Sequence, residues 1–353
     1  MKAWLDPRSR IGLIMIAGAL LALPFVAAGG GQAWVRILDF AILYVFLALG
    51  LNIVVGFAGL LDLGYIAFYG VGAYVYALLA SPHLGLHLPV WIILPIGAFT
   101  ACIFGMLLGA PTLKLRGDYL AIVTLGFGEI IRIFLNNLDA PVNITNGALG
   151  INLIDPVKFG GVSLAGQTEI FGLTLSGPQK YYFLLVALAI VVIVVNLRLQ
   201  HSRIGRAWQA IREDEIAAKA IGINTRNIKL LAFAMGASFG GIAGGIFAAM
   251  QGFISPESFS LTESVMILAM VVLGGMGHIP GVVLGAVLLA ILPEALRYLV
   301  VPAQKALFGS VLIDPESLRM LVFGLALVLV MRFRPAGLWP SPERKRELAE
   351  VEE

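Results

Sequence analysis

The residues that could do chemistry are concentrated in one charged block, which runs from Arg198 to Lys229. Long apolar runs lie on both sides of the block, so it must sit in water. Nothing in it forms a nucleophile and base pair or a set of metal ligands. Its charges are instead suited to contact with another protein. The candidate contact residues are Arg212, Glu213, Asp214, Glu215, Ala217, Ala218 and Gly222.

Within the block, the residue pattern predicts a short helix. Asp214 is a plausible N-cap, acidic residues suit a first turn, and Gly222 suits the position just past the end. Asn224 or Thr225 can cap the helix that follows. A helix of about two turns is marginal by itself. We therefore expect this one to dock into a groove of another protein rather than to stand free.

Outside the block, the sequence gives no sign of a catalytic or metal site. His83 and His87 have helical spacing, but Pro82 and Gly85 indicate a loop and no carboxylate stands near them in the sequence. Cys102 is the only cysteine, which excludes a disulfide within the chain. The phosphate-binding pattern Gly-x-x-x-x-Gly-Lys-Ser/Thr does not occur, so the chain does not bind ATP in that way. We expect no cofactor on this chain.

The bulk composition indicates a polytopic membrane protein. Of 353 residues, 59% are hydrophobic and 13% are charged, against roughly 45–50% and about 25% in soluble domains. Apolar runs of about 18 residues or more indicate spanning helices. We count ten membrane segments, at 11–28, 35–55, 57–80, 89–110, 119–135, 181–197, 228–250, 262–275, 280–299 and 317–332.

The distribution of basic residues predicts the orientation. With the N-terminus in the cytoplasm, the cytoplasmic pieces are 1–10, 111–118, 198–229 and the tail from residue 332, and they hold 17 of the 24 Lys and Arg residues. This obeys the positive-inside rule. The expected fold is an all-α membrane domain over 1–335, with both termini cytoplasmic. It has an outer loop at 136–180, a cytoplasmic loop at 198–229 and a charged tail at 336–353.

Two glycine-rich stretches interrupt the predicted spans. The run from Val54 to Gly59 resembles the run from Val272 to Gly277, and the two lie on segments of the same orientation. They predict discontinuous helices and a weak internal repeat, which is the usual pointer to a transport pathway. The alternative is that the glycines only let helices pack closely. The candidate pathway residues are Asn52, Gly56, Gly59, Asp62, Gly64, Gly274, Gly275 and Gly277.

Ionisable residues within the predicted spans are sparse. Ion-coupled secondary transporters usually place carboxylates or basic groups in mid-span, so their scarcity counts against that class. The lack of a nucleophile with a base counts against an intramembrane enzyme. Asp62 follows the first break, and we expect its carboxylate to cap the helix that comes next rather than to contact a substrate.

Together, these motifs resemble those of one transporter family. The stretch from Ala210 to Asn224, Leu115-Arg116-Gly117-Asp118-Tyr119, and Gly274-Gly275-Met276-Gly277 are similar to those of the permease subunits of branched-chain amino acid ABC importers. The resemblance covers roughly residues 35–335. It places the family's cytoplasmic Glu-Ala-Ala-x-x-x-Gly signature on Ala217, Ala218 and Gly222, with Ile216 in the place of the Glu. Which of Glu213, Asp214 and Glu215 makes the acidic contact is left open.

The resemblance implies a machine of several subunits. It implies a second related permease, two cytoplasmic ATPase subunits that carry ATP and Mg, and a soluble outer binding protein. It implies a bacterial inner membrane, and hence contact with lipid. The implied cargo is branched-chain or other hydrophobic amino acids, with urea or short amides as the alternative. With a net charge of only +3, the chain is not expected to bind nucleic acid.

Overall fold

The computed structural model describes residues 7–334, apart from 114, 116, 141, 160, 171–172 and 309–314, together with residues 337–340. The first six residues and most of the predicted tail at 336–353 lie outside this part of the chain. The cytoplasmic placement of both termini therefore stays a prediction.

Helices build the body of the molecule, and a helix overlaps each of the ten predicted intervals, with ends that differ from the predicted ones. Among the residues that the structure describes, six helical stretches are long and apolar enough to cross a membrane: 32–57, 90–112, 177–200, 225–251, 256–274 and 279–298. The α-helices are α1 (Pro7–Gly29), α2 (Gln32–Asn52), α3 (Ile66–Leu79), α4 (Val90–Thr112), α5 (Asp118–Asn136), α6 (Gly177–Gln200), α7 (Arg203–Glu213), α8 (Glu215–Ala220), α9 (Thr225–Gln251), α10 (Leu261–Gly274), α11 (Ile279–Phe308) and α12 (Pro315–Phe333).

The fold is not entirely helical, because short strands occur in the predicted outer loop. In the described part of the chain, β2 pairs with β3 and β4 with β5 inside this loop, and β1 of the loop pairs with β6, which follows α9; all three pairs are antiparallel. The loop is rich in turn residues and lacks helical periodicity, so its backbone groups pair across hairpins instead. The strands are β1 (Ile151–Asn152), β2 (Lys158–Phe159), β3 (Val162–Ser163), β4 (Thr168–Ile170), β5 (Leu173–Leu175) and β6 (Phe253–Ile254), with 3₁₀ turns η3 (Gly147–Leu149) and η4 (Pro256–Phe259).

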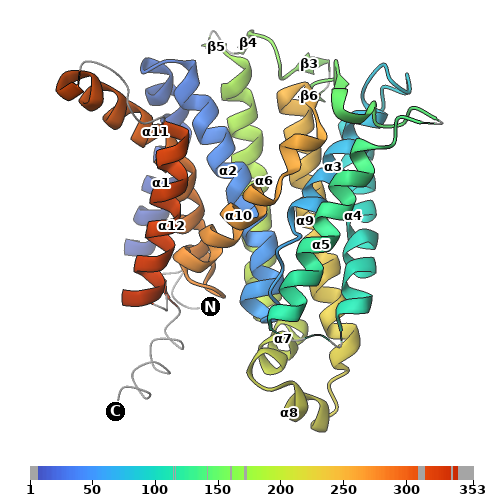
Figure 1. Ribbon diagram of the computed structural model, residues 1–353. Helices are drawn as coiled ribbons and strands as arrows, with labels where there is room; N and C mark the ends of the chain where they lie inside the picture. Colours follow the sequence, from blue (N-terminus) through green and yellow to red (C-terminus); the bar gives the residue numbers. More distant parts are fainter. Residues whose placement is uncertain are drawn as a thin grey trace.

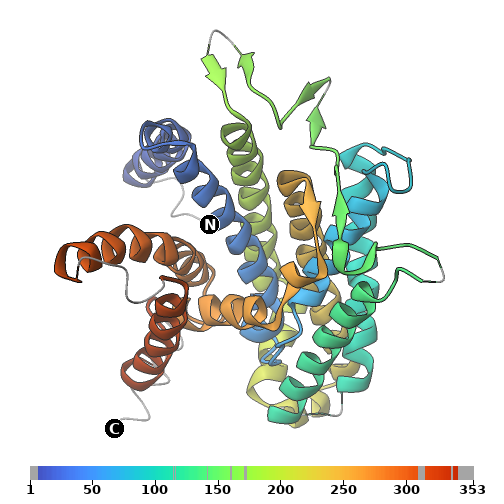
Figure 2. The same cartoon turned by 45° about the horizontal axis from the view of Figure 1, so that its top comes forward.

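The arrangement separates two ends of the helical bundle. The helices α7 and α8 lie at one end, and the labelled strands lie at the opposite end (Figure 1). Figure 2 shows α10, in orange, between the brown-red helices α11 and α12 and the group made by α3, α4, α5 and α9. The charged loop at 198–229 and the loop at 136–180 thus lie at opposite ends of the bundle (Figure 1), as the predicted alternating topology requires.

Glycine lets three central helices approach closely. A Cβ added at Gly72 of α3 would lie 2.1 Å from the carbonyl oxygen of Gly241 in α9, and one added at Gly244 would lie 2.0 Å from the carbonyl oxygen of Tyr69. A Cβ at Gly105 of α4 would lie 2.7 Å from the carbonyl oxygen of Phe233. For these three positions the packing explanation holds, since small residues let membrane helices come into backbone contact.

Candidate functional site

The first predicted break is present between α2 and α3. After Asn52 the chain makes a π-helical turn, η2 (Ile53–Phe57), and then runs without helix until Ile66. A π turn leaves the regular hydrogen-bond ladder and often marks a functional site. Gly59 has a φ of +68°, a backbone conformation that residues other than glycine rarely adopt.

The second break separates α10 from α11. Here Gly275 and Gly277 have φ values of +119° and +83°, so the chain reverses on backbone conformations that favour glycine. Gly274 has a different role, because a Cβ there would lie 2.3 Å from the carbonyl oxygen of Gly281. It therefore packs α10 against the start of α11. Both break regions predicted from sequence are present. Within the second, Gly275 and Gly277 allow the chain to reverse, whereas Gly274 allows two helices to pack closely.

These two breaks touch each other, although 225 residues separate the contacting positions. The backbone N–H of Gly277 donates a 2.9 Å hydrogen bond to Oδ1 of Asn52, which is fully buried. Gly56 lies against the same contact. A Cβ at Gly56 would stand 1.9 Å from Asn52 Oδ1 and 2.6 Å from the Gly277 nitrogen. Only glycine fits at Gly56 without moving the other break.

Arg212, at the end of α7, reaches this meeting point from the charged loop. Its Nη1 donates a 2.5 Å hydrogen bond to the carbonyl oxygen of Gly56. A Cβ at Gly277 would lie 3.0 Å from the same Nη1, and one at Gly59 would lie 2.7 Å from Arg212 Cγ. We call Asn52, Gly56, Gly277 and Arg212 the break junction. It joins the loop to both breaks through direct contacts.

The helix that carries Arg212 was not predicted. Sequence reasoning gave one short helix in the loop, but the structure has α7 as well as α8. The Ser202 hydroxyl caps α7 by accepting from the Gly205 N–H at 3.1 Å. Trp208 is fully buried, and its Nε1–H donates to the carbonyl of Ile228 in α9 at 2.8 Å. The block is therefore not wholly solvated, because α7 uses an apolar face to pack on α9.

The predicted short helix is α8, and its ends form as expected. Asp214 Oδ1 accepts hydrogen bonds from the backbone N–H groups of Ile216 and Ala217, at 2.7 and 3.1 Å. Gly222 has a φ of +90°. The N–H of Ile223 bonds the carbonyl of Ala218, and that of Gly222 bonds the carbonyl of Lys219, which is a Schellman ending. Asn224 then caps α9 through the N–H of Asn227.

The three acids of the block have different environments. Asp214 is used by the cap. Glu215 forms a 2.7 Å ion pair with Lys229, whose side chain is only 5% exposed. The Glu213 side chain is exposed. Glu213 is thus the acid that this arrangement leaves best placed for an outside partner.

Two isoleucines at the ends of α8 are open to solvent, Ile216 in its first turn and Ile221 at its C-cap. Ile216 is 69% exposed and Ile221 is 76% exposed, whereas Ala218 is buried against the rest of the chain. Exposed isoleucines at the water-facing end of a membrane protein are unfavourable unless something covers them. These two isoleucines are a second candidate contact, beside the charged residues.

Asp62 does not cap α3, contrary to the sequence prediction. Its Oδ1 accepts from the N–H of Gly64, at 2.9 Å, and so closes a turn within the break. The first backbone N–H of α3, on Ile66, instead bonds Oγ of Ser264 from α10. A Cβ on Gly64 would lie 2.0 Å from the carbonyl oxygen of Thr124, so Gly64 seats the break against α5.

Two carboxylates within predicted spans, Asp39 and Glu263, were not identified as candidate residues from the sequence. Asp39 of α2 is fully buried, and neither carboxylate oxygen has a hydrogen-bond partner among the residues that the structure describes. Glu263 of α10 accepts a 2.9 Å hydrogen bond from the Tyr44 hydroxyl. The signal was present, since both positions fall inside the intervals 35–55 and 262–275. Counting charges per span would have found them.

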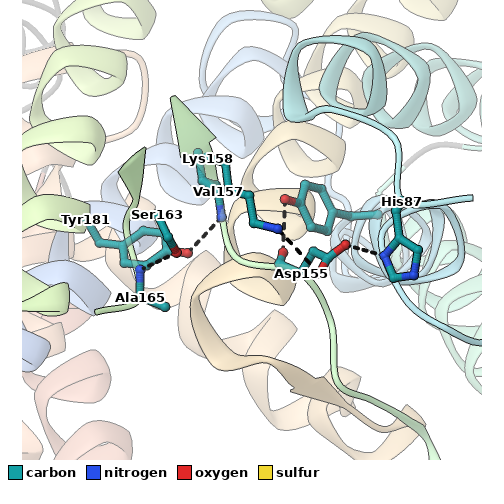
Figure 3. Close-up of polar contacts among 8 residues, drawn as sticks. His87, Asp155, Val157, Lys158, Ser163, Ala165 and Tyr181 are labelled. Carbon is teal, nitrogen blue, oxygen red and sulfur yellow. Dashed lines mark hydrogen bonds and ion pairs between the residues drawn. The ribbon is translucent and has the colours of Figure 1, made fainter. Parts of the chain in front are cut away.

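At the opposite end, the outer loop is fastened to the helices (Figure 3). His87 Nδ1 lies 2.5 Å from Asp155 Oδ2, so the loop supplies the carboxylate that His87 lacks in the sequence. Lys158 is 4.0 Å from the other oxygen of Asp155. The Tyr181 hydroxyl accepts from the N–H of Val157 at 3.2 Å. Across the described parts of the chain, no group of three or more His, Cys, Asp or Glu residues could hold a metal ion.

Comparison with known proteins identifies a family. Residues 33–331 match the family described as the permease component of a branched-chain amino acid transport system. No solved structure matches the chain.

Three relatives show how far the likeness extends. The high-affinity branched-chain amino acid transport system permease protein LivM of Escherichia coli is 43% identical over 97% of this chain and 77% of its own length. The LivH permease of Salmonella typhimurium is 26% identical over 85% of this chain and 92% of its own length. A probable LivM of Methanocaldococcus jannaschii is 28% identical over 73% of each chain.

Proposed function

This chain belongs to the branched-chain amino acid transport permease family, and from that premise we propose that it is the membrane-spanning permease subunit of an ATP-driven importer. Its cargo is branched-chain or other hydrophobic amino acids, delivered by an outer binding protein. The relatives that cover most of the chain are named for branched-chain amino acid transport, which supports this cargo over urea or short amides. The protein is a multi-pass membrane protein, and we assign it to the bacterial inner membrane.

The break junction is the observation that carries the mechanism. Arg212 of the cytoplasmic loop bonds the first break at Gly56, and Asn52 of that break bonds Gly277 of the second. A displacement of α7 is therefore passed to both breaks by hydrogen bonds rather than through a long chain of packed side chains. Because packed interfaces switch between discrete arrangements, a small shift at the loop can change which side of the membrane the pathway faces.

The partner that moves the loop is a cytoplasmic ATPase. Exposed isoleucines stand at both ends of the short helix α8, Ile216 in its first turn and Ile221 at its C-cap, and the exposed acid Glu213 comes shortly before it in the chain. This pairing of apolar and acidic groups suits a groove with an apolar floor and a basic rim. ATP and Mg would be bound on two such ATPase subunits, and ATP-driven closure of the pair would displace α7 and α8 together.

A second permease and an outer binding protein complete the assembly. Both LivM and LivH proteins are relatives of this chain, which supports pairing with a related but different permease. At the outer end, Leu149 and Leu153 are 74% and 77% exposed on the anchored loop. That loop is the surface we assign to the binding protein. Ten spans, both termini in the cytoplasm and the internal repeat complete the proposed topology.

Asp39 and Glu263 are evidence for the ion-coupled alternative, since carboxylates within membrane spans are typical of such transporters. Family membership and the ties between the loop and the breaks favour the ATP-driven reading. The deciding experiment is purification of the tagged chain in mild detergent from cells that carry its genomic neighbours. The proposal predicts an ATPase in the eluate and ATP-dependent amino acid uptake after reconstitution. Uptake that follows an ion gradient without ATP would overturn it.

A further inference from the structure

A cavity lies between α2, α3, α9, η4 and the first turn of α10. It holds about 180 Å³ and is walled by Phe40 and Tyr44 of α2, Tyr69 of α3, Phe247 of α9, Ser258 of η4 and Glu263 of α10. An apolar cavity of roughly 150 Å³ is large enough to bind benzene. This space can therefore take a branched aliphatic side chain with its α-carbon.

The walls of the cavity combine aromatic rings with one carboxylate. The Phe247 ring centroid lies 5.2 Å from that of Tyr69 and 6.4 Å from that of Phe40. Glu263 points across to α2, where the Tyr44 hydroxyl donates to its Oε2 at 2.9 Å. Rings attract a cation that lies over their faces, and a carboxylate held by a hydrogen bond is a strong partner for an ammonium group. An apolar wall next to an anion is the complement of an aliphatic amino acid.

We propose that this cavity holds the aliphatic amino acid on its way through the membrane, with Glu263 contacting the ammonium group and Phe40, Tyr69 and Phe247 contacting the side chain. This rests on the proposed function, and it names residues in this chain that contribute to specificity. The Tyr44 hydroxyl positions the Glu263 carboxylate.

The cavity is also connected to the breaks. Ile66, the first residue of α3 after the first break, lines it, and Glu263 stands on α10, the helix that ends at the second break. Ser264, next to Glu263, accepts from the Ile66 N–H at 3.3 Å. Movement of either break therefore changes the walls of the cavity, which links cargo binding to the coupling path.

The test uses the whole complex, with its second permease, ATPases and binding protein, reconstituted in liposomes. Glutamine in place of glutamate keeps an oxygen for Tyr44 but removes the charge. We expect Glu263→Gln to lower the initial rate of leucine uptake, at saturating binding protein, about tenfold or more. The matched control is Glu257→Gln, at an exposed position six residues away, which should transport like the wild type. Leucine uptake at the wild-type rate by Glu263→Gln would overturn the role of Glu263.

A second variant tests the apolar wall and does not depend on the first. Phe40 is half-buried, and Phe40→Trp narrows the cavity. It should reduce uptake of leucine and isoleucine several-fold more than uptake of alanine, whereas general damage would reduce all three alike and contradict the proposal. If both variants keep the rate and the preference of the wild type, the cavity inference is wrong and the proposed function stands. If the wild-type complex takes up no amino acid, the proposed function and the cavity inference are both wrong.

Discussion

The guanidinium group of Arg212 donates a hydrogen bond of 2.5 Å to the carbonyl oxygen of Gly56, 156 positions earlier in the chain. One partner belongs to the water-facing loop and the other to a break in a spanning helix. Through Asn52, the same break holds the N–H of Gly277 in the second break. The polar loop and the two glycine breaks, which the sequence presents as separate features, are therefore one site.

Loss of the Asn52 amide should impair transport. In Asn52→Leu, the partly buried N–H of Gly277 loses its acceptor, at a cost of up to about 1–3 kcal/mol. We expect amino acid uptake to fall about tenfold. The control is Asn196→Leu, an equally buried asparagine whose amide donates only within its own helix. Equal uptake by the two variants would remove Asn52 from the pathway.

A single methyl group at Gly56 should have a large effect. In Gly56→Ala, the added Cβ would overlap Asn52 Oδ1 and crowd the Gly277 nitrogen, at 1.9 and 2.6 Å. We expect the breaks to separate and uptake to fall strongly while the protein remains in the membrane. Gly126→Ala in α5 is the control, since nothing lies within 4 Å of its added Cβ. Normal uptake by Gly56→Ala would show that the close contact of Gly56 with Asn52 and Gly277 is not needed for transport.

Glu213 and Glu215 should differ in what they disturb. Glu215→Gln leaves the buried ammonium of Lys229 without its ion pair, which destabilises a protein by up to about 3–5 kcal/mol, and less here because Glu215 is partly exposed. We expect a lower melting temperature for the permease alone. Glu213→Gln should leave that temperature unchanged and weaken binding of the ATPase. Thermal unfolding measures the first effect and copurification of the ATPase measures the second. If Glu213→Gln lowered the melting temperature and Glu215→Gln weakened ATPase binding, the two assignments would be wrong.

The exposed isoleucines at the two ends of α8 should be required for assembly. Ile216→Ser together with Ile221→Ser removes the apolar surface without touching the caps at Asp214 and Gly222. If this surface enters a groove of the ATPase, its loss costs about 1.5–3 kcal/mol per side chain, and the ATPase should no longer copurify. Asn227→Ser, another exposed side chain of the loop, should copurify normally. Retention of the ATPase by the double variant would place the docking surface elsewhere.

The sequence predicted the local features of the site well, because they depend on neighbouring residues. The cap at Asp214, the ending at Gly222 and both glycine breaks follow from rules that act over a few positions. The helix positions also followed, since long apolar runs in a membrane must satisfy their backbone groups internally.

Contacts between distant residues could not be predicted in this way. The approach of Gly277 to Asn52 depends on how α10 crosses the molecule, and one sequence gives no measure of that crossing. The helix α7 was not predicted because its many charged residues suggested a fully solvated segment, although Trp208 and Ile211 form a buried apolar face. Asp62 was predicted to accept from the first N–H groups of α3, but it accepts from Gly64 within the break. The N–H of Ile66 at the start of α3 bonds Ser264 of α10 instead, a contact between helices far apart in the sequence. The strands in the outer loop are too short for a pattern to show.

The most direct test of the account is the ratio of amino acids imported to ATP hydrolysed by the reconstituted complex carrying Arg212→Ala. A charged hydrogen bond of this kind contributes about 1.5–3 kcal/mol, so the ratio should fall about tenfold or more while ATP hydrolysis continues. Arg203→Ala, at an exposed position of the same helix, should keep the ratio of the wild type. An Arg212→Ala complex that imports as many amino acids per ATP as Arg203→Ala would contradict the claim that this contact couples the loop to the breaks.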